Sequence, residues 1–157
     1  MICPTWQQIL DGSQTQMRVV VKPNEDYDPI FDAVSWGADY RTAPRIKYYP
    51  GQTLAVQPGF GQKQVGRIRI IAIRKEHLQE ISEEDALAEG CDYRMYDYVR
   101  SYDISGGPIA DVGYDTPVEV YTERWQDNHT KPGTRWADNP VVWVLDFELV
   151  QGKECES

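Results

Sequence analysis

Alternating hydrophobic and polar residues predict several strands along this chain. Residues 142–149 alternate between large apolar side chains and valines or acidic residues, which is typical of a half-buried strand with its aromatic face on the core. Residues 65–73 show the same period, and shorter strands are expected at residues 14–21 and 52–56, where β-branched and aliphatic residues gather. In the segment 65–73, the small and aliphatic positions expected on one face are Gly66, Ile68, Ile70 and Ala72.

Helix signals occur at three places between these strands. Residues 4–10 carry apolar side chains at helical spacing, and Gly12 follows as a stop. Ser82 begins a capping sequence before a short helix that ends at Gly90. Thr116 begins a second one, with proline at the first helical position and a glutamate that can reach back to the cap.

Two segments lack a clear period. Residues 22–50 are punctuated by prolines and glycines and are expected to be a long irregular loop. A structureless loop of that length is unusual in a compact domain, so this segment is expected to be either functional or partly structured. Residues 91–115 are rich in tyrosine and are expected to be an insertion or flap. Strands do not alternate regularly with long helices, so a doubly wound parallel sheet is disfavoured. The order of elements predicts one α+β domain over residues 1–157, built as a small mixed β-barrel with short flanking helices.

Composition narrows the class of protein. The 157 residues are 41% hydrophobic and 26% charged, which is ordinary for a globular domain. No apolar run is long enough to span a bilayer, and the first residues do not resemble a secretory signal, so we expect a cytoplasmic protein without a membrane partner. The three cysteines and two histidines match no zinc pattern, and no metal or other cofactor is expected.

The net charge of −9 restricts contacts with nucleic acid. Affinity gained by covering many phosphates requires the opposite sign. A nucleic-acid ligand would therefore have to be held by a local basic site with a small footprint.

Four segments, in this order and spacing, resemble the ASCH domains of the PUA-like superfamily, especially those of phages and prophages. They read GQTLAVQPG at 51–59, GQKQVGRIRI at 61–70, ISEEDALAEG at 81–90 and WADNPVVWVLDF at 136–147. The resemblance covers most of the chain outside residues 23–47 and 91–115.

This resemblance implies a PUA-like β-barrel with a cleft beside the first helix–strand junction, and binding of RNA or another nucleic acid. One bacterial branch of the family resembles small amide hydrolases that act on acylated cytidine nucleosides. Their cleft signature is Gly-x-Lys-x-x-Thr-x-Arg, or the same with Glu for Thr, together with a Glu at the end of the short helix.

The present chain departs from that signature. Gly12 matches its first position, but Gln14 stands where the lysine belongs. Met17 stands where the Thr or Glu belongs, and Val19 where the final arginine belongs. Arg18 comes one position early, which in a regular strand reverses the face and would turn its side chain away from the cleft.

The helix-end glutamate is present as Glu89. A divergent hydrolase would use Thr15 as the hydroxyl, Glu89 as base and Lys63 in place of the missing lysine. The alternative role for Glu89 is to fix the neighbouring loop.

Cationic and polar side chains supply candidate ligand contacts. Arg67 and Arg69 project from one strand face and could join Lys63 and Arg18 in a patch for one or two phosphates, or could simply pair with nearby acids. Gln57, at a strand end, offers a donor and an acceptor to a base edge, or terminates strand hydrogen bonds.

Aromatic side chains supply the remaining candidates. Trp36 and Tyr40 could stack on an unpaired base, or could pin the irregular loop to the barrel. Trp125, Trp136 and Trp143 are expected in the core.

The leading hypothesis is a module that binds RNA, single-stranded DNA or a modified nucleoside through Gly12, Gln14 and the residues just named, without chemistry of its own. The divergent hydrolase is the second. The third is an acidic phage protein that engages a basic protein partner.

Overall fold

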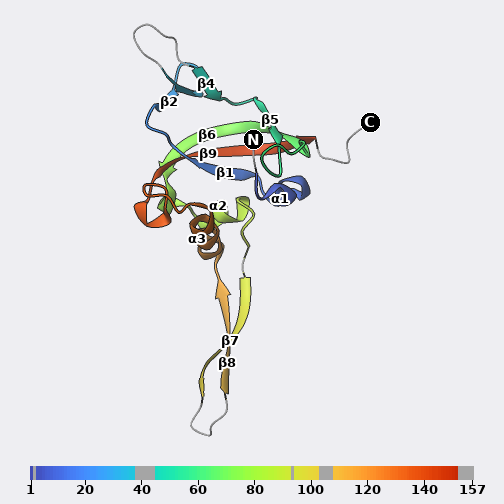
Figure 1. Cartoon of the computed structure of the whole chain (residues 1–157), viewed down its shortest axis with the longest axis vertical. Helices are drawn as coiled ribbons and strands as arrows, with labels where there is room; N and C mark the ends of the chain where they lie inside the picture. The colour runs from blue at the N-terminus through green and yellow to red at the C-terminus, as the bar shows by residue number, and fades with distance from the viewer. Residues whose placement is uncertain (2, 38–44, 93, 103–107, 152–157) are drawn as a thin grey trace.

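A four-stranded antiparallel sheet forms the centre of the molecule (Figure 1). The computed structural model describes residues 1, 3–37, 45–92, 94–102 and 108–151. The sheet runs in the order β1 (Gln16–Val20), β9 (Val141–Gln151), β6 (Gly66–His77) and β5 (Thr53–Val56). The predicted α+β class is confirmed. The hydrogen-bonded pairs among the described strands leave β1 and β5 as open edges and do not close the sheet into a barrel.

Strand β9 is buried on both faces along its first half, so the prediction of a half-buried strand was wrong there. Trp143 and Leu145 enter one cluster of buried side chains, and Val142 and Val144 enter another on the opposite face. The alternating pattern therefore predicted the buried face that carries Trp143 and Leu145, but not the second buried face that carries Val142 and Val144. The second core exists because β9 lies between β1 and β6 and is covered on both sides.

Strand β6 contains an irregularity that the sequence pattern did not indicate. Its register with β9 shifts between Ile70 and Ala72, so the face reverses at this point. Ile68 and Ile70 are buried as expected, but Ala72 is exposed and Ile73 packs inward in its place.

The expectation of an irregular loop over residues 22–50 was wrong for most of the described part, whereas the alternative that the segment is partly structured is confirmed. These residues form a second antiparallel sheet of β2 (Glu25–Asp28), β3 (Ala33–Trp36) and β4 (Arg45–Tyr48). This sheet packs Val34 and Tyr48 against Trp143 of β9. Burial of these side chains stabilises short strands that local sequence preference alone does not specify.

The three helices occur where they were predicted. They are α1 (Trp6–Asp11), α2 (Glu83–Ala88) and α3 (Pro117–Asn128). Gly12 ends α1 with a left-handed backbone (φ 85°), which glycine adopts without strain. The Ser82 and Thr116 side chains accept hydrogen bonds from the backbone N–H groups of Asp85 and Glu119, as N-caps do.

Single-turn 3₁₀ helices complete the body at η1 (Leu78–Glu80) and η2 (Trp136–Asp138). Residues 94–102 and 108–115 form the antiparallel strands β7 (Arg94–Tyr102) and β8 (Pro108–Asp115), which extend away from the sheet beyond α3 in Figure 1. No helix in the described part of the chain is long and apolar enough to cross a membrane.

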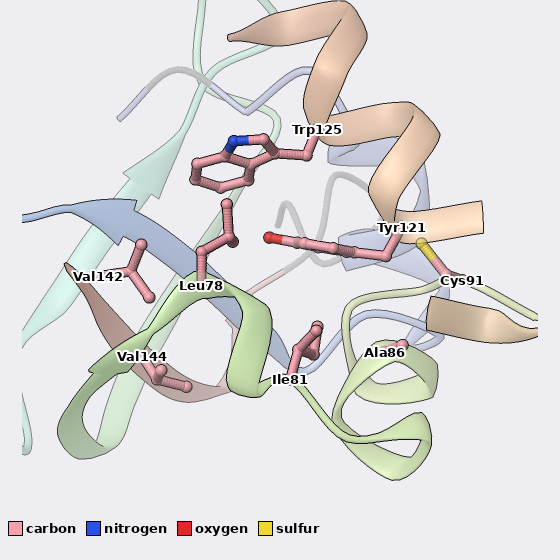
Figure 2. Close-up of a cluster of buried hydrophobic side chains, with 8 residues drawn as sticks. All are labelled: Leu78, Ile81, Ala86, Cys91, Tyr121, Trp125, Val142 and Val144. Atoms are coloured by element: carbon pink, nitrogen blue, oxygen red, sulfur yellow. The ribbon is translucent and has the colours of Figure 1, made fainter. Parts of the chain in front are cut away.

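The helices α2 and α3 cover the face of the sheet opposite β2–β4 (Figure 1). Figure 2 shows the Tyr121 and Trp125 rings of α3 pointing toward Leu78 and Val142. Trp125 and Trp143 are core residues as predicted, whereas Trp136 is partly buried and packs at the margin of this cluster. The last residues, 152–157, lie outside the described part.

Candidate ligand-binding cleft

A cleft of about 610 Å³ lies along the edge of β1, between α1 and α3. Its volume is within the range of about 300–1,000 Å³ that is common for small-molecule sites. Apolar and aromatic side chains form much of its wall. The polar and charged residues that line it are Thr5, Gln14, Arg18, Lys22, Glu89, Arg124, Asn128, His129 and Thr134.

The backbone of β1 also faces this cleft. Thr15 O accepts a hydrogen bond from Phe147 N at 2.9 Å, and Val21 N donates to Val141 O at 3.0 Å, so the odd-numbered residues direct their backbone groups toward β9. In an antiparallel ladder the intervening residues point the other way. The N–H and C=O groups of Arg18 and Val20 therefore face the open edge.

Arg18 is the most heavily contacted side chain of the site. Its side chain is 0% exposed, and Nη1 donates to Glu89 Oε2 at 3.0 Å while Nη2 donates to Asp85 Oδ2 at 3.3 Å. The guanidinium also donates to Glu76 and to the Gln16 side chain. Its Nε is buried without an acceptor among the described residues.

The expectation that Arg18 points away from the cleft was wrong. Gln16, Arg18 and Val20 share the face of β1 that is directed toward α2 and α3, and Glu89 lies on that side. The one-residue offset from the family signature therefore still brings a cation to the helix-end glutamate.

Glu89 follows the last residue of α2, and its side chain is almost completely buried. Burial raises the pKa of its carboxyl to about 7, against the opposing effect of the positive charges on Arg18 and Arg124. Arg124 Nη2 lies 3.6 Å from Glu89 Oε1 and donates to the Glu89 backbone oxygen at 2.8 Å. Near neutral pH this carboxyl exists in both protonation states and can donate or accept a hydrogen bond.

Gln14 is buried between α1 and β1. Its Nε2 donates to Gln16 O at 3.0 Å, which occupies one acceptor on the open edge of β1, and its Oε1 accepts from the Thr5 hydroxyl. A glutamine amide carries two N–H donors and an oxygen with two lone pairs, so each end retains capacity for a ligand.

Aromatic rings from two elements complete the wall. Tyr48 comes from β4, Trp125 from α3, and His129 is the residue that follows α3. The Trp125 and His129 rings stack at 3.6 Å between centroids with 7° between planes. Burial lowers the pKa of His129, so this ring is neutral at physiological pH. The stacked pair is a flat apolar surface.

The charge balance at the cleft differs from that of the whole chain. Among the described lining residues three are basic (Arg18, Lys22 and Arg124) and one, Glu89, is acidic. Because Arg18 is also paired with Glu76 and Asp85, the positive charge available to a ligand comes mainly from Lys22 and Arg124.

Three of the residues selected from sequence, Gln14, Arg18 and Glu89, line this cleft together. Gly12 ends α1 and does not line the cleft. Tyr40 lies outside the described residues. The remaining candidates do not line it: Thr15, Lys63, Gln57, Arg67, Arg69 and Trp36.

The outlying candidates have local partners instead. Arg69 Nη1 donates to Glu148 at 2.9 Å, and Arg67 Nη2 donates to the Thr53 hydroxyl at 3.2 Å. Gln57 Nε2 donates to Gln62 O at 3.0 Å. The expected basic patch of Arg67 and Arg69 with Arg18 is therefore not formed, because Arg18 is buried at the opposite edge of the sheet.

The loop and hydroxyl candidates also lie elsewhere. The Arg45 guanidinium lies 5.0 Å from the centre of the Trp36 ring, so this ring contacts the neighbouring strand β4 of its own sheet. Thr15 and Lys63 are both exposed, and of the three residues assigned to hydrolysis only Glu89 reaches the cleft. Thr15 directly follows Gln14, and successive side chains of an extended segment point to opposite faces, so Thr15 points away from the side on which Gln14 lies.

Sequence analysis did not select Thr5, Tyr121, Arg124 or His129, which also line the cleft. For α3 a signal was present: Arg124 lies three positions and Trp125 four positions after Tyr121, and Trp125 was expected in the core. Because Arg124 lies beside these buried rings, its charge is expected either to pair with an acidic side chain or to face a cavity. No cluster of metal-ligating side chains occurs among the residues that the structure describes.

Comparison with protein-family models, with curated proteins and with solved structures found no match to this chain.

Proposed function

We propose that this chain is an ASCH-type, PUA-like module that binds a nucleobase in the cleft, presented by single-stranded RNA or DNA or by a modified nucleoside. The observation that carries the proposal is the convergence of Gln14, Glu89 and Arg124 on one cleft beside the open edge of β1. The cleft lies next to the junction of α1 and β1, which is where the resemblance implies a ligand site.

The chemistry of the walls suits a flat heterocycle. The backbone groups of Arg18 and Val20, the Gln14 amide and the Glu89 carboxyl provide donors and acceptors at the depth of the cleft. A ring edge can use both kinds, and the half-buried His129 ring, which stacks on Trp125, offers a flat surface for the ring face. Stacking of this kind contributes about 1–3 kcal/mol per base.

Charge sets the size of the ligand. Lys22 and Arg124 can contact one or two phosphates at the cleft, whereas the net charge of −9 opposes a long nucleic-acid footprint. A short single-stranded segment or a nucleotide therefore suits the site better than a duplex.

Binding is a better fit to the cleft than hydrolysis. Thr5 is a hydroxyl in the cleft wall, and it donates to the Gln14 oxygen. A glutamine amide does not take up a proton at neutral pH, so it cannot activate this hydroxyl as a base would.

The test is titration of the full chain with short RNA and DNA oligonucleotides and with free and modified nucleosides, followed by calorimetry and tryptophan fluorescence. We expect binding at low salt that weakens as salt is added. Arg124→Gln removes a charge-assisted contact worth about 1.5–3 kcal/mol, so affinity for the best ligand should fall about 10- to 100-fold. Arg124→Lys should recover part of it.

Arg69→Gln is the matched control, because Arg69 is exposed, pairs with Glu148 and does not line the cleft. It should bind as the unchanged protein does. The proposal is wrong if nothing in the panel binds at low salt, or if Arg69→Gln weakens binding as much as Arg124→Gln does.

A further inference from the structure

The turn between β2 and β3 presents two large apolar side chains to solvent. Ile30 is 85% exposed and Phe31 is 67% exposed, and they occupy the middle of the four-residue connection between Asp28 and Ala33. Neither side chain belongs to any of the buried clusters. Exposed apolar pairs at the tip of an ordered hairpin are characteristic of protein contact sites.

This turn is held in one conformation by its own polar groups. Asp28 Oδ1 accepts a hydrogen bond from Ile30 N at 2.9 Å, and the Tyr27 hydroxyl donates to the Asp32 carboxylate. Asp32 has a left-handed backbone (φ 47°), a conformation that aspartate tolerates better than most residues. A turn that is ordered before it meets a partner loses less conformational entropy on binding.

The charged side chains that the β2–β3 segment itself places beside the two apolar side chains have a single sign. Asp26, Asp28 and Asp32 flank them, and residues 23–37 contain no lysine or arginine. The fourth acid of the segment, Glu25, is buried and paired with Lys47. The surface formed by residues 26–32 therefore combines an apolar centre with an acidic surround, and we call it the acidic tip.

We propose that the acidic tip docks onto a basic protein surface with an apolar pocket that receives Phe31 and Ile30. Charge argues against the other occupants. Nucleic acid and anionic membranes would be repelled by the three aspartates, and a second copy of this chain also carries a net charge of −9. Acids around an apolar anchor accelerate encounter with a cationic partner, and the anchor supplies most of the affinity.

This inference does not depend on the nucleobase cleft. The acidic tip contributes no residue to the cleft lining, and the cleft contributes none to the tip. A result against one therefore leaves the other unaffected.

The test uses the full chain and two synthetic 16-residue peptides. Both carry the same number of lysines and arginines; the first has leucine and phenylalanine between them, and the second has serine at those positions. We expect the first peptide to bind at least tenfold more tightly than the second in surface plasmon resonance. Asp26→Asn with Asp32→Asn should lower the association rate and its dependence on salt.

Ile30→Ser with Phe31→Ser should weaken binding of the first peptide at least tenfold. The matched control is Phe60→Ser, because Phe60 is 94% exposed on a different turn, between β5 and β6. It should leave binding unchanged.

Three outcomes would overturn the proposal: no binding of the first peptide at low salt, equal binding of both peptides, or equal loss from Phe60→Ser. Sedimentation adds a fourth. Self-association of the chain that disappears in the Ile30→Ser, Phe31→Ser variant would assign the tip to a second copy instead.

Discussion

Replacing Arg18 by methionine tests the central claim about the cleft. The substitution keeps an unbranched side chain of similar length and removes the charge that contacts Glu76, Asp85 and Glu89. Removing one partner of a buried ion pair generally costs about 3–5 kcal/mol, because the other charge is left without compensation.

The surrounding charges place the expected cost near the lower end of that range. Asp85 retains Arg74 at 2.8 Å, and Glu89 retains Arg124 at 3.6 Å. We therefore expect Arg18→Met to lower the free energy of unfolding by about 3 kcal/mol. For a chain of this size that corresponds to a fall in Tm of roughly 6–12 °C.

Urea denaturation at pH 7.5, followed by tryptophan fluorescence, measures this loss. Adding Glu89→Gln should restore part of this loss, because the Glu89 carboxyl no longer has to take up a proton or stay ionised without Arg18. Arg69→Met is the control, because Arg69 and Glu148 are 45% and 51% exposed and an exposed pair contributes about 0–1 kcal/mol. If Arg18→Met costs no more than Arg69→Met, the buried network does not stabilise the fold.

The other predictions concern pH, backbone and caps. Because the Glu89 pKa is about 7 in the folded chain against 4.5 ordinarily, the folded state holds a proton that the unfolded state has released, and stability falls as pH rises from about 4.5 to 7. The difference in unfolding free energy between the unchanged protein and Glu89→Gln should therefore change by about 3 kcal/mol across this interval in urea denaturation. His129 contributes with the opposite sign, but equally in both proteins, so its contribution cancels in this difference. A difference that does not vary with pH would contradict the buried carboxyl. Gly90→Ala should lower Tm more than Gly133→Ala: both glycines have positive φ (89° and 87°), but only at Gly90 does an added Cβ meet another atom, the Gln8 side-chain oxygen at 2.6 Å. Moving Gln8 aside gives up its hydrogen bond to Gly90 O and the one it accepts from Arg124, and equal losses would refute this reasoning. Thr116→Ala should cost about 1 kcal/mol in the same denaturation assay by removing the α3 cap, and Thr116→Ser should recover most of it.

Sequence reasoning was most accurate where a local rule decides the structure. The caps at Ser82 and Thr116 and the stop at Gly12 were predicted because each depends on a side chain or backbone freedom within one turn of chain. The strands 16–20 and 53–56 were predicted from their β-branched or aliphatic residues for a similar reason.

Sequence reasoning was least accurate where packing between distant parts of the chain determines the structure. The sheet β2–β3–β4 forms because Val34 and Tyr48 find Trp143 more than 90 positions away, and no periodicity within residues 22–50 reports this contact. The register shift at Ile70 likewise depends on the partner strand.

The candidate cleft shows the same division. Gln14 and Glu89 were selected through a resemblance carried by short motifs, and they lie together. Arg124 was not selected, because its role depends on how α3 crosses the end of α2, which the Val118 N to Glu83 Oε2 hydrogen bond at 3.1 Å helps to fix.

Strand β9 has a consequence for synthesis. It is the last strand among the residues that the structure describes, yet it supplies Val142, Phe147 and Leu145 to three separate buried clusters. A nascent chain on the ribosome therefore has none of its cores complete until residues 141–147 have emerged from the exit tunnel. Messages truncated before this point should yield polypeptides that proteases remove quickly.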